Sequence, residues 1–118
     1  MAIKTKTNTP VNITVSQAEV ILSIIIGNAQ IGGSQVKFQN EAAILIKGEV
    51  KGFSLGPGTG LKNKTLEIIT NVLDVNPGTN NIVITHQFAN GVPDKTVSGG
   101  TVDNAGDIFS LISTYHFI

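Results

Sequence analysis

Short runs of valine and isoleucine, each ended by glycine, asparagine or proline, recur along the whole sequence. In "VNITV", Val11, Ile13 and Val15 alternate with polar residues. In "SQVKFQ", Val36 and Phe38 fall on one side of an extended backbone. Alternation with a period of two, in segments rich in β-branched residues, is typical of half-buried strands. Because no segment sustains a helical period, the sequence predicts an all-β fold.

The spacing of these runs predicts seven to eight strands. Segments 64–75 and 81–88 flank "NPGTNN", whose proline and glycine suit a tight turn, so they are predicted to form a hairpin. The run 43–55 is predicted to be one strand with a β-bulge at Gly52, where the apolar phase changes. Short strands and turns favour a single-domain antiparallel β-sandwich of the immunoglobulin-like or jelly-roll type, with a small closed barrel as the alternative.

The charge and cysteine content narrow the class of partner. Eight basic residues, all of them lysine, balance eight acidic residues. Without a basic field or an arginine fork, the chain is not expected to bind nucleic acid. Without cysteine it has no disulfide, thiolate nucleophile or cysteine-type zinc site. No cofactor is expected.

The first ten residues, "MAIKTKTNTP", lack the apolar core of a signal peptide. The longest apolar run, "VILSIII", is too short to cross a bilayer, so no transmembrane segment is expected. The protein is therefore expected to be cytoplasmic or exported without a classical leader, and the compartment stays open. Residues 1–10 are predicted to form an extended arm that can pair with a neighbour's edge strand.

The glycine-rich stretch "FSLGPGTGLKNKT" invites comparison with phosphate-binding loops. Leu61 stands where the second glycine of a P-loop would be, and "KTLEIITNVLDV" after it has the pattern of a strand rather than a helix. Its backbone amides are not expected to converge on a phosphate, so the stretch is predicted to be a strand connection that binds no nucleotide.

No coherent catalytic set is present. There is no nucleophile elbow and no Ser-His-Asp arrangement. His86 shares the phase of Ile82, Ile84 and Phe88 and is expected to lie near the end of a sheet with one hydrogen-bond partner, and His116 is not expected to converge with it. The chain is predicted not to be an enzyme.

Residues 89–107 are predicted to form a long loop with at most one short strand near 96–97. Long loops without secondary structure of their own are often functional, and this one contains several side chains whose oxygen atoms can coordinate calcium. They form a candidate calcium or glycan site, although the spacing is not that of an EF-hand: Asp94, Asp103, Asn104 and Asp107.

Three strands carry aliphatic residues on both faces. In a monomer the outward positions of a solvated sheet should be polar, so several outward aliphatics in phase indicate a contact with another protein. The sequence therefore predicts a non-catalytic structural or interaction module that forms a homo-oligomer. The predicted interface residues are Ile21, Ile25, Ile69, Leu73, Ile108 and Ile112.

Overall fold

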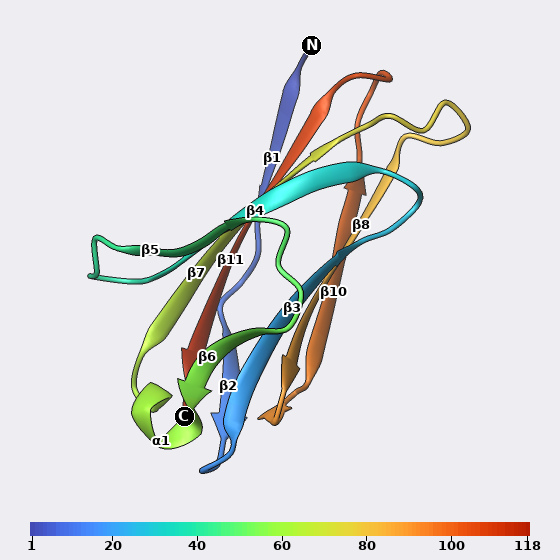
Figure 1. The fold of residues 1–118 in the computed structure, drawn as a ribbon. Helices are drawn as coiled ribbons and strands as arrows, with labels where there is room; N and C mark the ends of the chain where they lie inside the picture. Colours follow the sequence, from blue (N-terminus) through green and yellow to red (C-terminus); the bar gives the residue numbers. More distant parts are fainter.

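Two β-sheets and one four-residue helix account for the regular structure in the computed structural model, which describes all 118 residues (Figure 1). The all-β prediction is confirmed, and the two sheets form a single compact domain. The elements, in chain order, are β1 (Ile3–Thr7), β2 (Val11–Val15), β3 (Glu19–Ile26), β4 (Ile31–Phe38), β5 (Ile44–Gly48), β6 (Phe53–Pro57), α1 (Gly58–Leu61), β7 (Thr65–Leu73), β8 (Asn81–Ala89), β9 (Gly91–Val92), β10 (Lys95–Thr101) and β11 (Ile108–Phe117).

The larger sheet has the order β5-β4-β7-β11-β2-β9, and β1 also pairs with β11. The smaller sheet has the order β10-β8-β3-β6. All pairs are antiparallel except β1 and β2, which both run parallel to β11 along the same edge. Eleven strands replace the predicted seven to eight, because β5 and β6 divide the predicted run 43–55, β9 and β10 lie in the predicted loop, and β1 lies in the predicted arm. Assignment to the immunoglobulin-like or jelly-roll type stays a prediction.

The inward side chains of both sheets form the core. On β11, alternation predicts one apolar face, and Phe109, Leu111, Tyr115 and Phe117 are all buried, which confirms it. The core has two parts. The larger cluster is Ile13, Val15, Val20, Leu22, Val36, Phe38, Val50, Leu61, Leu66, Ile68, Phe88, Tyr115 and Phe117. The smaller cluster is Val72, Ile82, Ile84, Val102, Phe109 and Leu111.

The predicted hairpin between 64–75 and 81–88 is wrong, because β7 belongs to the larger sheet and β8 to the smaller. Residues 74–80 cross between the sheets, and the buried Gln30 holds them. Its Oε1 accepts hydrogen bonds from the N–H groups of Val75 at 2.7 Å and Asn76 at 2.9 Å, and its Nε2 donates to Asp74 Oδ1 at 2.8 Å. Proline and glycine mark where a chain turns, but they do not determine which sheet it enters next.

The predicted single strand 43–55 is also wrong. β5 ends at Gly48 in the larger sheet, and β6 begins at Phe53 in the smaller one. Gly48 has φ +106° and Gly52 has φ +65°, so the left-handed glycines allow the chain to change sheets. The change of apolar phase at Gly52 marks this crossing and not a bulge.

Residues 89–107 are mostly strand rather than loop. β10 pairs with β8 along its whole length, from Lys95 opposite Gln87 to Thr101 opposite Asn81. The sequence did not predict this strand because Gly99 and Gly100 have low strand propensity. They are needed for close packing: a Cβ at Gly100 would lie 2.6 Å from the Phe109 ring.

Candidate functional site

Four of the six predicted interface residues lie together on the outer face of the larger sheet. Ile108 is opposite Leu73, and Ile112 is opposite Ile69, across the β11–β7 pair. Leu73 is in turn opposite Ile31 of β4, whose side chain is 57% exposed. We call these five residues the face patch. Ile31 was missed, although its phase opposite to Val36 would have placed it outward.

The other two predicted interface residues lie in the smaller sheet, on the opposite side of the molecule. Ile21 and Ile25 belong to β3, and Ile25 is opposite Thr85 of β8, which is opposite Val97 of β10. Ile25 and Val97 are both exposed. The six residues therefore form two separate surfaces, because β3 is not a neighbour of β7 or β11.

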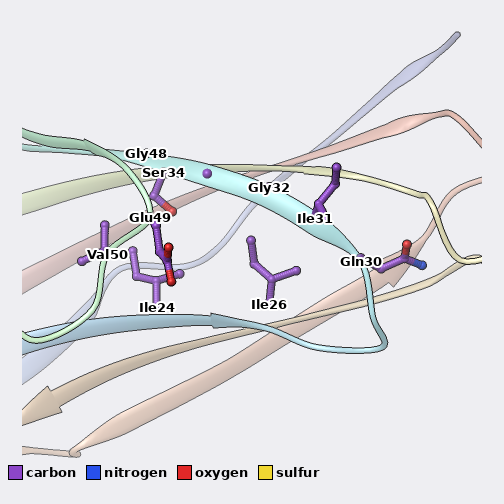
Figure 2. Close-up of a pocket in the computed structure, with 10 residues that line it drawn as sticks. Ile24, Ile26, Gln30, Ile31, Gly32, Ser34, Gly48, Glu49 and Val50 are labelled. Atoms are coloured by element: carbon purple, nitrogen blue, oxygen red, sulfur yellow. The ribbon is translucent and has the colours of Figure 1, made fainter.

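A groove opens between the sheets on the side of β3 and β4 (Figure 2). β6 pairs with β3 only as far as Leu22, and β5 pairs with β4 only from Ser34 onward. Where these pairings end, a hollow of about 250 Å³ separates the two strands. We call it the inter-sheet groove, and its lining includes Ile24, Ile26, Gly32, Ser34, Glu49 and Val50.

Two short stretches of strand edge are open beside this groove. Gly27 N–H donates to Val83 of β8, so by strand alternation the backbone groups of Ile26 point to the other side, toward the groove. Gln39 N–H donates to Thr65 of β7, so by the same alternation Gly32 points away from β7. No strand pairs with Ile26 or Gly32 on this side. Such edges can accept a further strand.

A line of hydrogen bonds crosses the core between the two clusters. Ser34 Oγ lies 2.8 Å from Thr70 Oγ1, which lies 3.3 Å from Nε2 of His86. Nδ1 of His86 lies 2.6 Å from the Tyr115 hydroxyl, which lies 2.6 Å from Thr96 Oγ1. The line therefore runs from Ser34 at the groove to Thr96 on the opposite side of the domain. His86 has two side-chain partners and not the predicted one.

Burial determines the charge of the groups in this line. Desolvation lowers the pKa of His86 to about 4, so the imidazole is neutral at pH 7. Burial also raises the pKa of Tyr115, against a smaller opposite effect of its hydrogen bond with Thr96. His116 instead bonds Thr65 at 3.0 Å, away from His86. The two histidines do not converge, as their phases indicated, and the absence of enzyme activity stays a prediction.

The candidate calcium residues are not gathered at one point. Asp94 precedes the seven-residue strand β10 and Asp103 follows it, a separation of roughly 20 Å. Asp107 Oδ1 accepts from Ala2 N–H at 2.9 Å, and its Oδ2 accepts from Asn104 N–H at 3.1 Å. The bond from Ala2 is the main cause that lowers the pKa of Asp107.

Asp107 thus joins the turn 103–107 to the start of β1. No group of three or more His, Cys, Asp or Glu side chains is close enough to hold a metal ion. Calcium or glycan binding by residues 89–107 stays a prediction.

The glycine-rich stretch contains β6 and a single helical turn, α1, followed by the strand β7. Leu61 of α1 is buried and covers one end of the larger cluster. Lys64 lies 3.7 Å from Glu41 and 4.8 Å from the centre of the Phe38 ring. The segment after the glycines is extended, as predicted, and the absence of nucleotide binding stays a prediction.

The chain matches no protein-family profile, no curated protein and no solved structure. No helix in the structure has the length and apolar character needed to cross a membrane.

Proposed function

We propose that this protein is a non-catalytic, self-associating module that serves as a subunit of a homo-oligomeric assembly, built on a β-sandwich of the immunoglobulin-like or jelly-roll type. The face patch is the observation that carries the proposal. It places five aliphatic side chains in register on three neighbouring strands of one outer face. A sheet face that meets only water should carry polar residues at these positions.

The surroundings of the face patch suit a protein contact. Between its two rows lie Asn71 and Ser110, and Lys37 is opposite Glu67 farther along the same face. Interfaces commonly combine apolar contacts with about one hydrogen bond per 100–200 Å², and Asn71 and Ser110 can supply hydrogen bonds between the two apolar rows. Full burial of an aliphatic side chain contributes about 1.5 to 3 kcal/mol, so these half-buried ones can supply several kcal/mol against the costs of association.

The test is the molar mass by light scattering across a concentration range. We expect the wild type to form oligomers and Ile112→Lys to give smaller, folded species. Ile25→Lys distinguishes the two surfaces because it changes the smaller sheet alone, and Thr59→Lys on α1 is a control at an exposed position. A wild type that stays monomeric at high concentration would show the proposal to be wrong. Unfolding of Ile112→Lys would mean that the position is internal.

The alternative is a ligand-binding module that uses residues 89–107 for a glycan or calcium. It is supported by a second hollow of about 260 Å³, whose polar lining is uncharged and includes Asn8, Thr96, Ser98, Ser113 and Tyr115. Calorimetric titration with calcium, followed by a glycan array, tests it. Saturable binding weakened by Thr96→Val would favour this alternative.

A further inference from the structure

We infer that the inter-sheet groove of one copy receives the N-terminal strand β1 of another copy, so that copies associate by exchanging an arm. This inference rests on the proposed self-association and names the two elements that form one of its contacts. Three observations support it. Backbone groups beside the groove have no hydrogen-bonded strand partner, the side chains of β1 are exposed in its own domain, and the side chains of β1 complement those that line the groove.

The groove is bordered by two strand edges that lack a partner. Ile26 on β3 and Gly32 on β4 turn backbone groups toward it, and neither has a strand partner there. Its apolar wall is part of the core, because Ile24 packs against both clusters and Ile26 against the smaller one. Figure 2 shows both side chains directed toward β4, and a Cβ at Gly32 would lie 3.0 Å from Ile26 Cδ1, so the two strands are close together at this end of the groove. An apolar side chain that enters the groove beside Ile24 and Val50 would be buried against the core.

β1 can leave its domain at little cost in side-chain burial. All five of its residues are exposed. Residues 8–10, which end in Pro10, join it to β2 outside any strand, and β2 stays anchored by the buried Ile13 and Val15. Withdrawal would break the pairing with β11, the bond from Ala2 N–H to Asp107 Oδ1 at 2.9 Å and the bond from Lys6 Nζ to Gly99 O at 3.1 Å. An edge strand in the groove would re-form part of this pairing.

The side chains of β1 suit the groove. Glu49 is the one charged residue in its lining. β1 offers Ile3, which is 66% exposed, followed by Lys4 on the opposite side of the strand. With Ile3 turned toward Ile24 and Ile26, Lys4 faces the rim and can pair with Glu49. An isoleucine flanked by a lysine therefore meets an apolar pocket flanked by a carboxylate.

Donor and acceptor lie on opposite edges of the larger sheet. β1 borders β11, whereas the groove borders β4, with β7 between β4 and β11 (Figure 1). Each copy can therefore donate and accept at once, and such head-to-tail contacts form rings or open chains. The face patch lies on β4, β7 and β11, so it stays in place when β1 leaves. The two contacts meet at Ile31, which belongs to the face patch and also lines the groove, whereas the other four face-patch residues lie outside the groove.

A cross-linking experiment tests the exchange directly, since the natural chain has no cysteine. Lys4→Cys and Glu49→Cys are purified separately, mixed and oxidised. We expect a disulfide-linked dimer containing one copy of each, identified by mass spectrometry of the linked peptides. The matched control replaces Glu49→Cys with Thr59→Cys, an exposed position on α1, and should give no linked heterodimer.

A charge exchange gives a second measurement that leaves the core unchanged. Glu49→Lys and Lys4→Glu should each weaken self-association by about fivefold, the upper range for an exposed ion pair. An equimolar mixture should recover part of the loss, because the altered arm then fits the altered groove. Lys62→Glu, at an exposed position away from the groove, is the control and should leave association unchanged.

The outcomes separate this inference from the proposed function. If the wild type forms oligomers but Lys4→Cys links to Thr59→Cys as readily as to Glu49→Cys, the arm exchange is wrong and self-association stands. If oligomers form and the mixture of charge variants recovers nothing, the pairing of Lys4 with Glu49 is wrong as well. A wild type that is monomeric at all concentrations overturns both.

Discussion

The two ends of the domain differ in how completely they are closed. At the end near α1, thirteen buried residues form the larger cluster, with Leu61 of the helix covering it. At the other end, six buried residues form the smaller cluster, and the inter-sheet groove opens beside it. The exposed β1 and the row from Ile31 to Ile108 of the face patch lie at this second, open end.

This difference separates stability from interaction within one small domain. Aromatic packing is concentrated at the closed end, where Phe88 lies 4.6 Å from Tyr115 and 6.0 Å from Phe117 between ring centres. The open end has fewer buried side chains and more unpaired strand edge. Regions that bind partners are commonly drawn from the less stable parts of a fold.

The largest loss of stability is expected for Phe88→Ala at the closed end. Phe88 is fully buried between Tyr115 and Phe117, and the cavity left by a phenylalanine costs about 3 to 5 kcal/mol. Urea denaturation of the wild type and variant gives the difference. A loss below 1 kcal/mol would show that the closed end does not dominate stability.

Acid should cause the next largest loss of stability, because it protonates His86 in the line of hydrogen bonds that crosses the core. The pKa of His86 is about 4 in the folded protein and 6.5 in the unfolded chain, so the unfolded state binds more protons between these values. Stability is complete above pH 6.5 and falls by about 3 kcal/mol as the pH decreases to 4.

Denaturation curves across pH 4 to 7 measure this acid effect. His86→Gln should flatten the profile, and His116→Gln should keep it. A wild-type profile that stays flat in this range would contradict the assignment to His86.

A smaller loss, about 2 kcal/mol, is expected for Ile82→Ala in the smaller cluster, at the lower limit for a buried isoleucine. Ile82 is buried, but it belongs to the cluster at the open end, which has fewer neighbours to leave unpacked. The same urea measurement compares it with Phe88→Ala. If both variants lose the same free energy of unfolding, the closed end does not contribute more to stability than the open end.

The smallest change is expected for Leu73→Lys on the face patch. The outer face contributes little to the fold of one copy, so the free energy of unfolding should change by no more than about 0.5 kcal/mol. The measurement is made at a concentration where the protein is monomeric. A loss of several kcal/mol would mean that Leu73 is part of the core.

The sequence predicted the faces of strands better than their partners. Alternation placed Phe109 and Tyr115 inward and Ile108 and Ile112 outward, because the side-chain period depends on the strand alone. Pairing depends on residues far apart in the chain. The turn after β7 therefore gave a correct boundary and a wrong partner.

The candidate site was predictable in part for the same reason. The phases of Ile69 and Ile108 were visible in the sequence, and so were the inward phases of His86 and Tyr115. The inter-sheet groove was not, because it exists where two pairings end, at Leu22 on β3 and Ser34 on β4. The strand β10 was hidden because Gly99 and Gly100 serve close packing rather than strand propensity.

The parallel pairing of β1 and β2 with β11 has a consequence for synthesis of the protein on the ribosome. Ile3 is opposite Ile108, and Ile13 is opposite Phe117. The strands β1 and β2 therefore cannot pair with β11 until the ribosome has added about 100 more residues. Folds dominated by such distant pairings form slowly, on a scale of about milliseconds to seconds. β11 pairs with β7 along one edge and with β1 and β2 along the other, so the larger sheet cannot be completed until residues 108–117 have emerged. A nascent chain therefore carries an unpaired β7 edge until β11 has emerged, a period in which chaperones have the opportunity to bind it.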